Sequence, residues 1–314
     1  MKTLEFLLAK RRPRGTEEAT AKSVLPKDAE FFYDTKGSFM FAMVDVVVDK
    51  NHPSRTIFSS HLDSVEYDVA GYNVLNVSKD GIMTVQGGGI LGADDGAGVW
   101  LMIKMMDKNV AGRYMFFAGE ESGGIGSKFA VANYPELFSD IDRAIAFDRR
   151  GNKDVIVSQY VGTCASPQFG IALADALSCD EYPFDVADGV YTDTAEMIGI
   201  VPECVNVSCG YLNEHSQKES LDLVFLFSLL DKLIKLDWGS LPTKRVPMAP
   251  KSRTKSVNKF ADFDWDFDFD LPNKKSDAAY DVDLEEFIDG MYMAGITVSD
   301  LVAYIKKTGD TDLL

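Results

Sequence analysis

The chain has 314 residues, 46% of them hydrophobic, which is enough to bury the core of one sizeable catalytic domain and to add a small appendage. Its formal net charge of −17 argues against nucleic acid and against membranes as partners, because both attract surfaces rich in lysine and arginine. No run of residues approaches the roughly 20 apolar positions that a membrane span needs, and the first residues lack the pattern of a signal peptide.

Apolar runs separated by turn residues predict alternating strands and helices over the first 240 residues. The helical patterns cover 1–10, 96–106, 126–133, 166–177 and 221–236. The strand patterns cover 39–48, 56–60, 113–118, 143–147 and 203–208, with a hairpin in 73–86 that turns at Asp80-Gly81. This alternation predicts an α/β fold with a mixed, largely parallel central sheet flanked by helices.

The composition changes after residue 240. We interpret 1–240 as the catalytic domain, 241–270 as a linker that contains an acidic-aromatic segment, and 271–314 as a small helical module. In 262–270, aspartate alternates strictly with phenylalanine or tryptophan. Two interpretations of this segment stay open: a disordered linker, or an extended peptide that docks on its own chain, a second copy or a protein partner.

The four cysteines, Cys164, Cys179, Cys204 and Cys209, include no Cys-x-x-Cys pair. In a chain without an export signal, we expect them to be reduced, and buried packing explains them more simply than zinc ligation. Together with the lack of an export signal, they predict a cytoplasmic protein.

Several acidic or imidazole side chains directly follow predicted strands. His61 follows 56–60, Glu120 and Glu121 follow 113–118, and Asp148 follows 143–147. Open α/β sheets gather their sites at the carboxyl ends of their strands, so we expect these segments to converge there.

The motif His61-x-Asp63 combines a good zinc ligand with a carboxylate that can accept a hydrogen bond from the other ring nitrogen. The pair Asp94-Asp95 follows a glycine-rich loop. Asp94 is a candidate bridging carboxylate with Asp95 in support, and the alternative is a helix N-cap, which explains one aspartate easily but not both.

Adjacent glutamates point in different directions, so Glu121 can bind a metal while Glu120 faces a water molecule as general base. His215 lies shortly before the last long helix, and we expect its neighbour Glu214 to face solvent. Tyr211 is a candidate donor to an oxyanion, although a half-buried structural tyrosine is the simpler interpretation.

Asp148 is followed by Arg149 and Arg150. One interpretation is a surface ion pair of little energetic value. The other makes Asp148 a metal ligand and one arginine a binder of a substrate carboxylate.

In this order, the set resembles that of the dinuclear zinc exopeptidase superfamily over about residues 1–240. The resemblance implies two divalent cations, zinc or alternatively cobalt or manganese, and five ligands: His61, Asp94, Glu121, Asp148 and His215. It also implies that Glu120 is the general base and that Asp63 orients His61.

Within that resemblance, His61 and Asp148 hold one metal, Glu121 and His215 hold the other, and Asp94 bridges them. Only 66 residues separate Asp148 from His215 and 30 separate Asp63 from Asp94, so neither interval has room for the separate domain that some members insert there.

The resemblance therefore favours a compact aminopeptidase that hydrolyses the amino-terminal bond of peptides. Two alternatives use the same metals, an amidohydrolase or deacylase and a carboxypeptidase-type enzyme. A catalytically silent scaffold that works through its tail is the alternative outside enzymes.

Overall fold

A computed structural model describes residues 2–51, 54–65 and 71–247. Its α-helices are α1 Lys2–Ala9, α2 Glu17–Val24, α3 Ala93–Asp107, α4 Ile125–Asn133, α5 Pro167–Leu177 and α6 Leu223–Lys235. Its strands are β1 Glu30–Tyr33, β2 Phe39–Val46, β3 Thr56–His61, β4 Leu75–Val77, β5 Ile82–Val85, β6 Gly112–Phe117, β7 Arg143–Arg149, β8 Asp154–Gln159, β9 Gly162–Thr163, β10 Asp185–Asp188, β11 Glu203–Ser208, β12 Tyr211–Leu212 and β13 Ser220–Asp222. Three short 3-10 helices complete them: η1 Pro135–Phe138, η2 Asp193–Met197 and η3 Trp238–Ser240.

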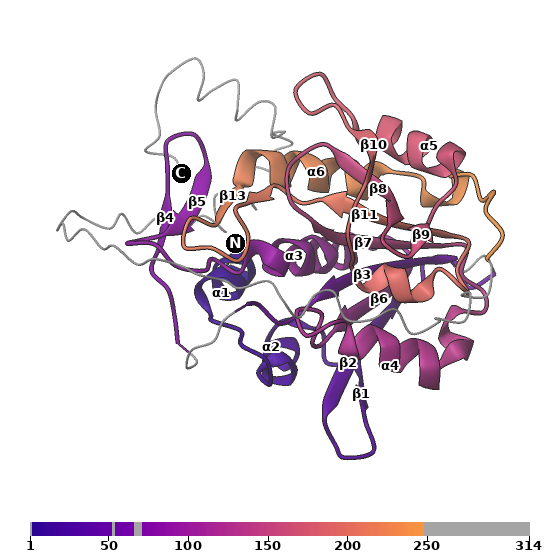
Figure 1. The fold of residues 1–314 in the computed structure, drawn as a ribbon, viewed down its shortest axis with the longest axis horizontal. Coiled ribbons are helices and arrows are strands. Elements are labelled where there is room, and N and C mark those ends of the chain that lie inside the picture. The colour runs from indigo at the N-terminus through magenta and orange to yellow at the C-terminus, as the bar shows by residue number, and fades with distance from the viewer. Residues whose placement is uncertain (1, 52–53, 66–70, 248–314) are drawn as a thin grey trace.

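The main sheet has the strand order β1-β2-β6-β3-β7-β11-β8-β10, with β9 paired to β8. Its centre is parallel, because β3 pairs in parallel with both β6 and β7, and β7 pairs in parallel with β11. Antiparallel pairs lie on both sides of this centre, at β1–β2, β2–β6 and β11–β8. The predicted mixed, largely parallel α/β sheet is therefore confirmed (Figure 1).

Each central strand buries side chains on both faces of the sheet, which explains its continuous apolar sequence. Phe58 belongs to the core beneath α1, α3, α5 and α6, whereas its neighbour Ile57 belongs to the core beneath α4 and η2. Phe116 and Phe117 divide in the same way between the two cores. The two layers of helices thus hold the parallel strands rigidly. The carboxyl ends of these strands share one edge of the sheet.

A second sheet, of order β12-β13-β5-β4, lies apart from the main one. Figure 1 shows its β4–β5 hairpin projecting at the end of the molecule where α1 lies. The hairpin was predicted, but β13 was not. Its residues Ser220–Asp222 pair with β5, so α6 begins at Leu223 rather than at 221, with the Asp222 side chain accepting a hydrogen bond from Phe225 N.

The other predicted helices and strands of the first 240 residues are present within a few residues of their expected ends. The acidic-aromatic segment 262–270 and the helices expected in 271–314 lie outside the described residues. In the part of the chain that the structure describes, no helix has both the length and the apolar character to span a membrane.

Candidate metal centre

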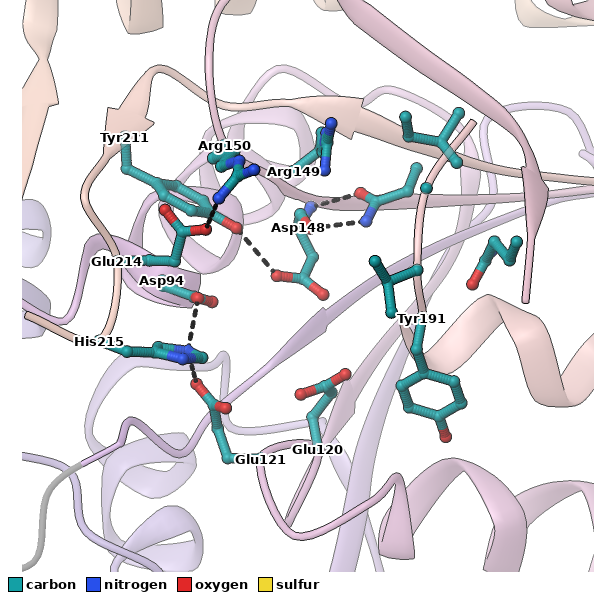
Figure 2. Close-up of a pocket in the computed structure, with 15 residues that line it drawn as sticks. Asp94, Glu120, Glu121, Asp148, Arg149, Arg150, Tyr191, Tyr211, Glu214 and His215 are labelled. Atoms are coloured by element: carbon teal, nitrogen blue, oxygen red, sulfur yellow. Dashed lines mark hydrogen bonds and ion pairs between the residues drawn. The ribbon is translucent and has the colours of Figure 1, made fainter. Parts of the chain in front are cut away.

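The candidate side chains meet at the carboxyl edge of the main sheet, as expected. His61 is the last residue of β3, and Asp148 is the second-last residue of β7. Glu120 and Glu121 follow β6. Asp94 lies at the start of α3 and His215 in the loop between β12 and β13. Figure 2 shows the side chains of Asp94, Glu120, Glu121, Asp148 and His215 around one cavity.

Asp94 occupies the middle of this cluster. Its Oδ1 lies 3.0 Å from His61 Nε2, and its Oδ2 lies 3.1 Å from His215 Nε2. His61 Nε2 is also 3.5 Å from Asp148 Oδ1, and His215 Nε2 is 2.9 Å from Glu121 Oε1. One carboxylate therefore presents an oxygen to each of two separate ligand pairs.

These residues fit a pair of divalent cations. Ligand atoms of His61, Asp94 and Asp148 lie within 4.8 Å of one another, and so do those of Asp94, Glu121 and His215. The two groups share Asp94, and a third group joins His61 to both Glu120 and Glu121. Imidazole nitrogens and carboxylate oxygens are ligands that zinc accepts, and a shared carboxylate is what a two-metal site requires.

The charge of the cluster leads to the same conclusion. Among the described residues, no lysine or arginine forms an ion pair with Asp94, Glu120, Glu121 or Asp148. A concentration of carboxylates out of water is costly unless cations or protons offset it. The two histidines supply part of the positive charge, and divalent cations would supply more.

The pKa values of the acidic side chains reflect this cost. Burial raises the pKa of Glu120 well above its ordinary value, and the charge of Asp148 adds to it. Burial also raises the pKa of Glu121 and of Asp148. Burial alone would lower the pKa of His215, but its hydrogen bonds to Asp94 and Glu121 raise it to about 11. In the absence of cations, the cluster therefore retains protons that bound metal would displace.

His61 is held in one tautomer. Its Nδ1 lies 3.0 Å from the backbone oxygen of Asp63, an acceptor only, so Nδ1 carries the proton and Nε2 faces Asp94 and Asp148. The Asp63 carboxylate is farther away, with Oδ1 3.6 Å from Nδ1, and it accepts a hydrogen bond of 3.2 Å from Glu120 N. Asp63 thus contacts both the histidine and the loop of the expected base.

The helix-cap interpretation fits Asp95, the aspartate that we expected only to support the site. Asp95 Oδ1 accepts a hydrogen bond from Gly98 N, and its Oδ2 accepts from Ser60 Oγ and His61 N. Asp94 and Asp95 both have non-helical backbone angles, so the regular helix begins after them. Asp95 therefore fixes the start of α3 against β3, and Asp94 is free to face the cavity.

His215 has a left-handed backbone, with φ of 59°. A residue other than glycine adopts this conformation at a cost that its surroundings must offset, and such residues concentrate at functional sites. Here the conformation directs the ring at Glu121 and Asp94 (Figure 2).

Tyr211 differs from the expectation of a half-buried side chain. It is 2% exposed, and its hydroxyl donates a hydrogen bond of 3.2 Å to Asp148 Oδ1. Thr192 Oγ1 donates to Asp148 Oδ2 at 2.6 Å, and Asn206 bonds the Asp148 backbone at both N and O. These hydrogen bonds hold both carboxylate oxygens and the backbone of Asp148, with Oδ1 also facing His61.

The arginines do not pair with Asp148, so the surface ion pair considered for that residue is wrong. Arg149 binds Asp154, and Arg150 binds Glu214 at 2.9 Å. The expectation that Glu214 faces solvent is also wrong, because its side chain is 20% exposed and lines the cavity.

Arg12 is a contributor that the sequence did not reveal. It is fully buried, and its guanidinium donates hydrogen bonds to the backbone oxygens of Leu62 and Gly92. Leu62 directly follows His61, and Gly92 lies two residues before Asp94. A Cβ atom at Gly92 or Gly96 would lie about as close as 3 Å to the guanidinium, which explains the glycines there. Arg12 thus ties two ligand-bearing segments together.

Glu219 is a second such contributor. Its carboxylate accepts hydrogen bonds from the backbone N–H groups of Leu91, Gly92 and Asp94, at 2.8, 3.0 and 3.1 Å. It therefore fixes the loop that places Asp94. The only sequence signal was its position four residues after His215.

Known proteins that are similar to this chain are peptidases. The family model described as Peptidase family M28 matches residues 43–178. A comparison with curated protein sequences finds no match.

Three solved structures illustrate the structural likeness. Aminopeptidase PepT from Bacillus cereus ATCC 10987 has a TM-score of 0.62 and 15% identity, over 74% of this chain and 95% of that one. A tripeptidase from Staphylococcus aureus has a TM-score of 0.53 and 15% identity, over 74% and 95% of the two chains. The TET1 peptidase of Pyrococcus horikoshii, described as assembling into a tetrahedron or a large octahedral shell, has a TM-score of 0.52 and 15% identity, over 74% and 97%. At these identities, the likeness shows a shared fold.

Proposed function

We infer that this chain is a metal-dependent aminopeptidase of the dinuclear zinc exopeptidase superfamily, in which the carboxylate of Asp94 would serve both cation sites. The observation that carries the proposal is the position of Asp94, with one oxygen toward His61 and the other toward His215. A buried carboxylate between two separate ligand pairs has little use in a scaffold protein.

In this proposal, His61 and Asp148 would hold one cation, and Glu121 and His215 would hold the other. When bound, two divalent cations provide an acidified water and polarise the scissile carbonyl. Asp63, Asp95, Tyr211 and Thr192 hold the ligands in place through the hydrogen bonds described above.

Glu120 is the residue that we assign to proton transfer. It lines the cavity beside Glu121 but is not needed in either three-residue group that contains Asp94. Its carboxylate accepts a proton from the attacking water and delivers it to the nitrogen of the leaving amine. Burial raises the pKa of Glu120, which favours the uptake of a proton by this carboxylate.

The cavity supports action at a chain end, and the structural relatives support the amino-terminal end. The cavity has a volume of about 270 Å³, near the lower end of the range for small-ligand sites, which favours a chain end over an internal stretch of peptide. Two of the solved structures above are described as an aminopeptidase and a tripeptidase. A free α-amino group can itself ligate a cation, which would restrict cleavage to the first residue.

Three finer points belong to the same proposal. Zinc is the cation that we expect, because both ligand pairs contain an imidazole. A homo-oligomer is proposed because the TET1 peptidase, which has the same fold, is described as forming large shells. A cytoplasmic location is proposed because all four cysteines are free thiols.

The proposal is tested with the metal-loaded full chain and two substrate panels, aminoacyl anilides and N-acyl amino acids. We expect hydrolysis of the anilides, loss of activity on chelation and recovery on adding zinc, cobalt or manganese. Hydrolysis of the N-acyl amino acids alone would instead show a deacylase. No bound metal, and no activity after metals are restored, would show that the enzyme assignment is wrong.

A further inference from the structure

The two consecutive arginines of the cavity are held differently. Arg149 places both Nε and Nη2 on Asp154 Oδ2, at 3.1 and 2.9 Å, and its side chain is 23% exposed. Arg150 forms one hydrogen bond, from Nη1 to Glu214 Oε1 at 2.9 Å, and its side chain is 57% exposed. A guanidinium has five N–H donors, so Arg150 retains most of its hydrogen-bonding capacity.

Arg150 lines the same cavity as the metal centre. Both arginines line the cavity that contains Asp94, Glu120 and His215, and Glu214 directly precedes His215 in the chain. Figure 2 shows Arg150 and Glu214 side by side, next to Tyr211 and on the Asp94 side of the cavity. The wall formed by Ile156, Gln159, Gly189, Val190 and Asn206 carries no charge. Of the residues that line this cavity, Arg150 is thus the cation with donors to spare.

Another carboxylate can replace Glu214 as the partner of Arg150. A half-exposed ion pair with one hydrogen bond is held weakly, because solvent screens it. A carboxylate that reached both terminal nitrogens of Arg150 would form the stronger paired arrangement. Elsewhere in the cavity, an incoming carboxylate would meet the acidic side chains of the metal centre and be repelled.

We propose that Arg150 determines specificity by binding a carboxylate of the peptide substrate, which takes the place of Glu214. The proposal rests on the peptidase function inferred above and names the substrate class of that site. The carboxylate has two possible sources in a substrate that fits this small cavity: the C-terminus of a dipeptide, or the side chain of an acidic amino-terminal residue.

The test compares matched substrates that differ only in a carboxylate. One pair is a dipeptide and its C-terminal amide, and the other is a glutamyl anilide and a glutaminyl anilide. The metal-loaded parent enzyme should have the lower KM for the carboxylate member of at least one pair. Preference confined to the dipeptide pair identifies the C-terminus, and preference confined to the anilide pair identifies the acidic side chain.

Variants separate recognition from support of the fold. R150Q should raise KM for the preferred carboxylate substrate by about tenfold or more and leave its uncharged partner nearly unchanged. R150K, which keeps the charge but loses the planar fork, should fall between the two. E214Q should lower KM for the carboxylate substrate, because Arg150 then has no acid to release. R149Q is the matched control, and it should leave the ratio of KM values within about twofold, because that arginine is committed to Asp154.

Two results would overturn the proposal: an equal effect of R150Q on both members of each pair, or a parent enzyme that shows no preference for a carboxylate. The first would mean that Arg150 only supports the loop of His215. Both differ from a failure of the peptidase function itself, in which no member of either pair is hydrolysed after metals are restored.

Discussion

Asp94 Oδ1 lies 3.0 Å from His61 Nε2 while its Oδ2 lies 3.1 Å from His215 Nε2, so both halves of the centre depend on one carboxylate. Asp94→Asn should therefore weaken the binding of both cations, because an amide offers one neutral oxygen in place of two charged ones. We expect less than one metal ion per chain after dialysis, against two in the parent. Elemental analysis of the dialysed proteins measures the difference.

Asp148→Asn is the control for this prediction, because Asp148 contacts His61 but not His215. It should retain about one metal ion per chain, since one ligand pair is unaltered. An Asp94→Asn protein that still holds two ions would show that Asp94 does not bridge them.

Glu120→Gln should abolish most turnover and leave metal binding intact. The amide cannot accept a proton from water, and removal of a general base typically costs about 10²- to 10⁴-fold in rate. We expect kcat to fall by that order with two metal ions still bound. Glu121→Gln, one residue away, should instead lose metal, because its carboxylate lies 2.9 Å from His215. A Glu120→Gln enzyme with the parent's kcat would remove Glu120 from the mechanism.

The sequence predicted the strand ends that carry His61 and Asp148 because the central strands are buried on both faces and read as apolar runs. Their convergence followed from the shared carboxyl edge of a parallel sheet. Strand β10 was not predicted, because it is the four-residue edge strand Asp185–Asp188, with an acidic residue at each end.

The supporting residues could not be predicted, for a different reason. Arg12 acts on backbone oxygens 50 and 80 residues away, and Glu219 acts on backbone N–H groups more than 120 residues away. Backbone N–H and C=O groups are common to nearly all residues, so the residue types did not indicate either set of hydrogen bonds. The expectation that Glu214 faces solvent was wrong for the same reason, because only the fold brings Arg150 to it.

The stability of the metal-free protein should fall as pH rises from neutral to alkaline. The pKa of His215 is raised from 6.5 to about 11, so its stabilising charge is fully present below pH 6.5 and is lost as pH rises through about 11. Glu120, Glu121 and Asp148, with raised pKa values, act in the same direction, because the folded state retains their protons longer than the unfolded state does.

Bound metal should reverse this dependence. Cations displace the retained protons, so metal affinity, and the stability it confers, should increase with pH. Thermal unfolding in chelator and in zinc from about pH 6 to pH 9 compares the two states. Titration calorimetry in buffers of different ionisation enthalpy counts the protons released. Metal binding without proton release would contradict the protonation states described here.

Glu219→Gln should lower both the free energy of unfolding and the metal affinity. Its carboxylate accepts three backbone hydrogen bonds, one of them from Asp94 N, whereas the amide would turn an NH₂ group toward one of those donors. A buried unsatisfied donor costs about 1–3 kcal/mol. The displaced Asp94 should then bind both cations less tightly, which a competitive zinc titration measures.

Glu203→Gln gives the matched control. Glu203 is also fully buried and accepts backbone hydrogen bonds from Ser166, Lys244 and Arg245, but it begins β11, at the end of that strand away from the metal centre. Its substitution should destabilise the fold by a similar amount, measured by denaturant unfolding, while zinc affinity stays that of the parent. If Glu219→Gln likewise left zinc affinity unaltered, the hydrogen bond to Asp94 N would serve only the stability of the loop and not the geometry of the centre.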